Sequence, residues 1–133
     1  KEHYIYKLIS KLNIKKEVRI IKPLSDISNF YKKASIFCIP SYYEGFPNAL
    51  AEAMIYGCAC IGFKDCSGVN ELIKNNKTGL LANGINNEKN LTEKLAILMK
   101  KKELRFKLGS NARKFIANYN KDEIIKKWEA LLS

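Results

Sequence analysis

Histidine, tryptophan and acidic metal-binding motifs are scarce or absent in this chain of 133 residues. The one histidine, His3, falls near the N-terminus on a helical pattern, so we expect it on the surface rather than as a base or a ligand. No Asp-x-Asp pair occurs, and Cys58-x-Cys60 has neither the spacing of a zinc site nor a second pair to match it. We therefore expect no metal ion.

Cysteine is limited to four residues, Cys38, Cys58, Cys60 and Cys66. All of them lie in or beside segments that we expect to form buried strands. We interpret them as reduced, small core residues rather than as ligands or disulfide partners.

Long apolar runs are also missing. The chain has no stretch of 18 apolar residues and no charged-then-apolar N-terminal signal, so neither a transmembrane helix nor secretion is indicated. A content of 47% apolar and 28% charged residues is typical of one soluble globular domain. We expect a cytoplasmic location.

Negative charge is sparse beside positive charge, with 13 Asp and Glu against 24 Lys and Arg, a net charge of +11. Such an excess favours anionic partners. The scattered lysine pairs have two open interpretations. In the first, they only lie on solvent-exposed faces of the domain; in the second, they attract the whole protein, as a peripheral protein, to the anionic inner face of the cell membrane. We expect no nucleic-acid partner, because most aromatic residues lie within apolar stripes rather than beside lysines.

The most informative stretch is residues 41–57, where a buried strand is followed by a helix. Ile36 to Ile39 is an unbroken apolar run, which favours a parallel strand covered on both faces over an edge strand. Ala49 to Tyr56 contains one polar residue, which predicts a helix packed almost all round. Pro47 suits its first turn and Gly57 its end.

Two carboxylates, Glu44 and Glu52, belong to this stretch. An ionised carboxylate is costly to bury alone, so Glu52 should be paired or should face a cleft. Gly45 lets the backbone approach a ligand, and the free amides of the first helical turn suit phosphate or sugar oxygens. Pro47 and Glu52 lie roughly 7 to 8 Å apart along a helix, so the two carboxylates could contact different ends of one extended ligand. The alternative is that Glu44 caps the helix and Glu52 pairs with a buried Lys or Arg.

The run from Glu44 to Met54, closed by Gly57, resembles the Glu-x7-Glu motif of retaining glycosyltransferases of family 4, which have the GT-B fold. In that family the motif lies in the C-terminal, nucleotide-sugar-binding domain. The resemblance covers nearly the whole chain and implies metal-independent transfer from a nucleotide diphosphate sugar, with no cofactor. It also implies that the N-terminal acceptor domain and the Arg and Lys that clamp the diphosphate lie outside this sequence.

The resemblance further implies roles for individual residues. Glu44 would lie by the transferred sugar as the catalytic residue, and Glu52 would hold the ribose hydroxyls. Gly68 and Glu71 match a Gly-rich turn and a glutamate that close the donor pocket, although a helix-capping turn with an exposed glutamate is an alternative. The donor sugar and phosphates would meet Gly45, Phe46, Pro47, Asn48, Ala49 and Leu50, and the base would meet Pro23 and Leu24, for which an ordinary turn is the alternative.

The fold class that we predict is α/β, a Rossmann-like parallel sheet of about four strands with C-terminal helices, as in a partial GT-B C-terminal domain. Glu44 should lie at the carboxyl edge of that sheet. We divide residues 1–133 into an α/β core, 1–118, and a C-terminal helix, 119–133. The expected strands are Val18 to Ile21, Ile36 to Ile39, Ala59 to Phe63 and Leu80 to Ala82.

A glycosidase that uses Glu44 and Glu52 as acid and nucleophile is chemically conceivable, but the strand order suits nucleotide binding better. A truncated, inactive remnant or a nucleotide-binding module without catalysis is the remaining alternative. We expect a glycan or lipid-linked acceptor, bound mostly outside this chain, and a role in bacterial polysaccharide, lipopolysaccharide or glycan assembly. The chain by itself should not transfer sugar, because half a cleft cannot position donor and acceptor together.

Overall fold

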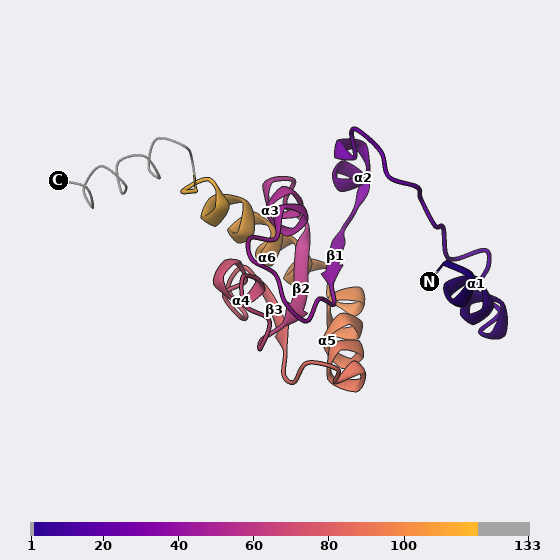
Figure 1. Cartoon of the computed structure of the whole chain (residues 1–133). Coiled ribbons are helices and arrows are strands. Elements are labelled where there is room, and N and C mark those ends of the chain that lie inside the picture. Colours follow the sequence, from indigo (N-terminus) through magenta and orange to yellow (C-terminus); the bar gives the residue numbers. More distant parts are fainter. Residues whose placement is uncertain (1, 120–133) are drawn as a thin grey trace.

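The structure is a computed structural model that describes residues 2–119, in which helices cover a three-stranded parallel sheet (Figure 1). The strands are β1 (Ile36–Ile39), β2 (Ala59–Phe63) and β3 (Gly79–Ala82), in that spatial order. Both strand pairs are parallel. The predicted α/β class with a parallel sheet is therefore confirmed. The helices are α1 (Glu2–Lys11), α2 (Ser28–Lys33), α3 (Asn48–Ile55), α4 (Val69–Leu72), α5 (Glu88–Lys100) and α6 (Lys102–Ile116).

The central strand β2 is buried along its whole length because helices pack on both of its faces. Ile61 belongs to a cluster with Leu98 of α5 and Leu108 of α6. Cys60 belongs to another cluster, which includes Leu50 and Met54 of α3 and Leu72 of α4. Ala59, Cys60 and Ile61 thus alternate between the two clusters, with the period of two expected of a strand. The carboxyl edge of this sheet is where the loops after β1 and β2 lie.

Strand β1 is less enclosed than its apolar sequence predicts. Only Ile39 is buried, Ile36 and Phe37 are half-buried, and Cys38 is exposed. In the part of the chain that the structure describes, β1 is an edge strand, so the expectation of a strand covered on both faces is wrong. The interpretation of Cys38 as a core residue is wrong for the same reason, whereas Cys58, Cys60 and Cys66 are buried.

The strand predicted at Val18 to Ile21 does not form. Residues 18–24 are irregular, and Val18 and Ile21 are exposed. A strand is stable only when a neighbour takes up its backbone hydrogen-bonding groups, and no strand among residues 2–119 pairs with this segment. The sheet therefore has three strands instead of about four.

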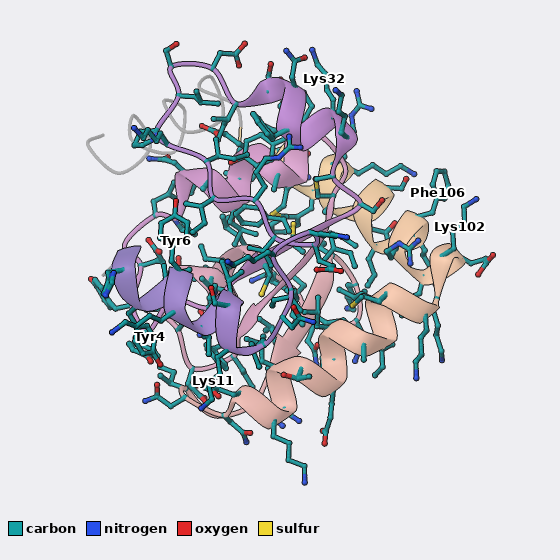
Figure 2. All side chains as sticks on the ribbon, turned by 90° about the vertical axis from the view of Figure 1, so that its right-hand side faces the viewer. Tyr4, Tyr6, Lys11, Lys32, Lys102 and Phe106 are labelled. Atoms are coloured by element: carbon teal, nitrogen blue, oxygen red, sulfur yellow. The ribbon has the colours of Figure 1, made fainter. Side chains whose placement is uncertain are left out.

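Helix α1 lies apart from the sheet (Figure 1). Its apolar residues recur at helical spacing and form one stripe, of which Ile9 is buried, while Tyr4, Ile5 and Leu8 are exposed. Figure 2 shows Tyr4 and Tyr6 among the side chains that α1 presents at the surface. The stripe that predicts a packed helix thus has few partners in the described chain.

Helices α5 and α6 pack on the sheet largely as their periodicity predicts. Leu98, Leu108 and Ala112 are fully buried. Met99 is 66% exposed, because Leu98 and not Met99 faces the sheet in the last turn of α5. The C-terminal helix that we predicted at 119–133, which includes Trp128, lies outside the described residues except for residue 119. None of the helices within 2–119 has the length and apolar character needed to cross a bilayer.

Candidate functional site

The loop between β1 and α3 brings the two motif carboxylates to one end of the sheet. β1 ends at Ile39 and α3 begins at Asn48, so Pro47 directly precedes the helix instead of lying in its first turn as predicted. Parallel strands end at the same edge of a sheet, so this loop and the turn after β2 are neighbours at the carboxyl edge, where ligands bind in open α/β sheets. Glu44 therefore lies at the edge where we expected it.

The Glu44 carboxylate is held by a local hydrogen bond. The hydroxyl of Ser41 donates to Oε1 of Glu44 over 2.7 Å, and the Glu44 side chain is half-buried. The residue before α3, Pro47, offers no side-chain cap. Glu44 is thus oriented by the strand end rather than by the helix, which differs from the capping role that we considered as the alternative.

Gly68 packs directly on this loop. It has a φ of +75°, and a Cβ atom at this position would lie 2.6 Å from the carbonyl oxygen of Gly45 and 2.7 Å from that of Glu44. Only glycine combines this backbone conformation with so close an approach. Burial, with a smaller contribution from the charge of Glu44, raises the pKa of the Cys66 thiol in the same turn. The turn after β2 therefore supports the motif loop, whereas Glu71 is exposed on α4.

Few backbone amides at the start of α3 remain available to a ligand. The amide of Asn48 donates to the carbonyl of Phe46 over 3.0 Å, and that of Leu50 donates to Pro47 over 2.9 Å. Pro47 has no N–H group. Within residues 2–119, the amides of Gly45, Phe46 and Ala49 have no backbone acceptor. Among residues 45–50, these three amides are the ones left to meet an anion, in addition to the partial positive charge of the helix end.

Glu52 faces a hollow of about 310 Å³ between α3 and the segment before α2. Its side chain is exposed, and the hollow has no lysine or arginine among its described lining residues. The arrangement matches the expectation of a carboxylate that faces a cleft, not the alternative of a buried ion pair. The hollow also exposes the end of α3, which we expected to be packed almost all round. Its lining consists of Ser25, Asp26, Ile27, Ser28, Tyr31, Glu52, Ile55 and Tyr56.

Tyr31 of α2 is a site residue that the sequence did not single out. Its ring is buried and stacks on Tyr56, with centroids 5.7 Å apart and planes 14° apart. Its hydroxyl donates to the carbonyl oxygen of Ala49 over 3.2 Å. Burial, followed by the negative charge of the nearby Glu52, raises the pKa of Tyr31 to about 12. No motif marks this residue, because a tyrosine in an apolar stripe has the same pattern as a core aromatic.

Pro23 and Leu24 lie in the irregular segment before α2 and do not line the hollow. Leu24 is 48% exposed. The next two residues, Ser25 and Asp26, do line it. Asp26 accepts a hydrogen bond from the amide of Ser28 over 2.8 Å, and that bond lowers the pKa of Asp26.

No cluster of three or more His, Cys, Asp or Glu side chains suited to a metal ion occurs within residues 2–119. A second hollow, of about 750 Å³, lies beside α4 and is lined by Lys64, Lys74 and Lys77 among others. None of its described lining residues belongs to the motif. We therefore place the candidate site at the motif and the amides at the start of α3, and not at this larger hollow.

The sequence matches the profile of the glycosyl transferases group 1 family over residues 1–115. An uncharacterized glycosyltransferase of Haemophilus influenzae is 30% identical over 131 residues, which are 98% of this chain and 37% of that protein. An N,N'-diacetylbacillosaminyl-diphospho-undecaprenol alpha-1,3-N-acetylgalactosaminyltransferase of Campylobacter jejuni is 36% identical over 104 residues, 78% of this chain and 27% of that protein. The chain thus spans about a third of the length of these curated relatives.

Among solved structures, TarM of S. aureus, crystallised in complex with Fondaparinux, alpha-GlcNAc-glycerol and UDP, superposes with a TM-score of 0.87. The two sequences are 26% identical, and the match covers 97% of this chain and 26% of TarM.

Proposed function

The chain belongs to the glycosyl transferases group 1 family, and on this premise we propose that it forms the donor-binding part of a glycosyltransferase. The reaction is transfer of a sugar from a nucleotide diphosphate sugar to an acceptor hydroxyl, with retention of configuration and without a metal ion or cofactor. One observation carries the proposal: Glu44 and Glu52 flank the N-terminus of α3 at the carboxyl edge of a parallel sheet, and Glu52 faces a hollow.

In this proposal the donor lies along α3. The diphosphate meets the amides of Gly45, Phe46 and Ala49, where the helix end stabilises the negative charge that grows as the bond between sugar and phosphate breaks. Glu44, held by Ser41, lies by the transferred sugar. Glu52 accepts hydrogen bonds from the ribose hydroxyls, and the hollow beyond it has room for the rest of the nucleoside.

The acceptor is proposed to be a glycan or a lipid-linked glycan that binds mostly outside this chain. The relative from C. jejuni is named for a diphospho-undecaprenol substrate, which supports a setting in bacterial polysaccharide, lipopolysaccharide or glycan assembly. Such an acceptor would place the protein on the cytoplasmic side of the membrane as a peripheral protein. Basic side chains spread over α1, α2 and α6, among them Lys11, Lys32 and Lys102, would favour an anionic leaflet (Figure 2). No nucleic-acid partner is proposed.

The proposal is tested by separating binding from turnover in the full-length gene product. Glu52→Ala should weaken the binding of UDP or GDP about ten- to a hundredfold in calorimetry, because a charged hydrogen-bond partner is lost. Glu44→Ala should lower turnover more than nucleotide affinity. Glu93→Ala, on an exposed position of α5, is the matched control and should change neither. Unchanged affinity in Glu52→Ala would exclude the ribose assignment.

Retention and independence of metal are tested separately. The anomeric configuration of the first-formed product, read by NMR, should equal that of the donor. Turnover should persist in excess EDTA, and loss of turnover that added Mg²⁺ restores would contradict metal independence.

Residues 1–133 alone are expected to bind nucleotide weakly at most and to transfer no sugar. Holding donor and acceptor in one cleft can lower the barrier by roughly 7 to 11 kcal/mol. This chain spans only about a third of the length of its curated relatives, so we expect it to form only part of such a cleft. A monomeric 133-residue protein with an enzyme-like rate would contradict this expectation.

A further inference from the structure

Three aromatic rings from separate elements form a column that ends at the hollow faced by Glu52. The ring of Tyr31, on α2, packs against Phe37 of β1 with centroids 5.9 Å apart. On its other contact it stacks on Tyr56, the residue directly after α3, with planes 14° apart. Tyr31 is buried, whereas Tyr56 lines the hollow and is 39% exposed. Tyr56 is therefore the open end of the column, with its ring supported from behind.

Tyr56 follows Glu52 by one helical turn. The amide of Tyr56 donates to the carbonyl of Glu52 over 3.2 Å, so the helical backbone continues to this residue although α3 ends at Ile55. Residues four apart lie on one face of a helix, about 6 Å apart along its axis. This spacing is comparable to the span from the ribose diol to the base ring of a nucleoside. A nucleotide with its diphosphate at the start of α3 and its ribose at Glu52 would thus bring its base to Tyr56.

The charge of the hollow suits the uncharged half of a nucleotide. Its described lining residues include two carboxylates, Asp26 and Glu52, and no lysine or arginine, so a phosphate would be repelled there. Ile55, which also lines the hollow, adds exposed apolar surface beside the Tyr56 ring. A flat, uncharged base matches this surface, because each base has a π face that can stack on an aromatic side chain.

We propose that Tyr56 is a binding residue for the nucleobase of the sugar donor, which stacks on the exposed ring and extends the column of Phe37 and Tyr31. The inference rests on the proposed function, in which Glu52 binds the ribose. Stacking does not read the edge of a base, so this contact supplies affinity without selecting between a pyrimidine and a purine. The competing interpretation is that Tyr56 only packs against Tyr31.

The test measures binding of UDP, GDP and ribose 5-diphosphate to the full-length gene product by calorimetry. Ribose 5-diphosphate keeps the diol and the diphosphate but lacks the base. Tyr56→Ala should lower the affinity for whichever of UDP and GDP the wild type binds more tightly, by about tenfold. The same variant should leave the affinity for ribose 5-diphosphate unchanged. Tyr56→Phe should keep the wild-type affinities, since the ring remains.

Tyr119→Ala is the matched control. Tyr119 is likewise exposed and packs on another aromatic ring, that of Phe115, with centroids 5.5 Å apart. It does not line the hollow, so its removal should alter the affinity for none of the three probes.

A second readout does not depend on the stability of an alanine variant. In wild-type protein that is protonated only at its tyrosine rings, bound nucleotide should show intermolecular nuclear Overhauser effects between a ring and H6 of UDP or H8 of GDP. These effects should disappear in Tyr56→Phe prepared with deuterated phenylalanine, although the nucleotide still binds.

Three outcomes would overturn the inference: unchanged nucleotide affinity in Tyr56→Ala, an equal loss for the nucleotide and for ribose 5-diphosphate, or the same Overhauser effects in wild type and Tyr56→Phe. The equal loss is the result expected if Tyr56 only packs against Tyr31. Failure of the proposed function gives a different result, because it concerns the ribose. If Glu52→Ala left the binding of ribose 5-diphosphate unchanged, the ribose role of Glu52 would be contradicted, whatever the Tyr56 variants show.

Discussion

The two edges of the sheet, β1 and β3, differ in how completely the described chain covers them. All four residues of β3 are buried, and two of its outer backbone groups have partners. The amide of Asn76 donates to the carbonyl of Gly79 over 2.8 Å, and the amide of Leu81 donates to Asn75 Oδ1 over 2.9 Å. On β1, by contrast, only Ile39 is buried and Cys38 is exposed.

The difference shows that enclosure is not a property of a strand's own composition. The β1 residues are at least as apolar as those of β3, yet the turn before β3 folds back over its edge while residues 18–24 do not pair with β1. An open strand edge is a template for pairing with another segment or chain. The motif loop follows directly from β1, so the candidate site is built on the less enclosed edge.

The largest loss of stability that we expect comes from adding a side chain on β3, the covered edge of the sheet. In Gly79→Ala the new Cβ would lie 2.5 Å from the carbonyl oxygen of Cys60 and 2.9 Å from Ile73 Cγ2. Forcing β3 away from β2 should lower the free energy of unfolding by about 2 to 3 kcal/mol in urea denaturation. Cys38→Ala, a change of similar size on the open edge, is the control. Equal losses in the two variants would refute the contrast between the edges.

The next effect comes from removing the side chain that covers β3. Asn75→Ala takes the acceptor from the amide of Leu81, which should cost about 1 to 3 kcal/mol of stability and speed hydrogen exchange at that amide. Asn83→Ala, exposed in the turn after β3, is the control and should leave the exchange rate unaltered. Unchanged exchange at Leu81 in Asn75→Ala would mean that the edge is protected in another way.

A third experiment compares thiols on an edge strand and on the central strand. A thiol reagent added to the native 133-residue chain should modify Cys38 first and Cys60 last. Cys60 is fully buried, and burial raises the pKa of its thiol, so both access and the thiolate fraction are low. Mass spectrometry of partially labelled protein gives the order. Labelling of Cys60 at the rate of Cys38 would contradict the enclosure of β2.

The smallest effect is expected on α1. Leu8→Ser replaces an exposed apolar residue and should change the free energy of unfolding by no more than about 0.5 kcal/mol. Ile9→Ser, at the buried neighbouring position, should cost more and serves as the comparison. A large loss in Leu8→Ser would show that the apolar stripe of α1 is covered in solution.

The sequence by itself determined the bounds of β1 and β2 and the position of the motif. Ile36 to Ile39 and Ala59 to Phe63 form strands with the predicted bounds, and α3 ends before Gly57, which has a φ of +75°. These features follow from local patterns: a short apolar run, a proline at the helix start and a glycine at its end. The motif loop lies where such a strand-to-helix junction must place it.

Only the tertiary structure decided which groups meet. The hydroxyl of Tyr31 finds its acceptor 18 residues away, and Gly68 meets the loop of Glu44 from a separate turn. The missing strand at Val18 to Ile21 and the exposure of Cys38 have the same cause, because both depend on whether a distant segment supplies a partner. Local patterns encode the conformation of a segment, whereas hydrogen-bond partners and burial depend on contacts between segments far apart in the chain.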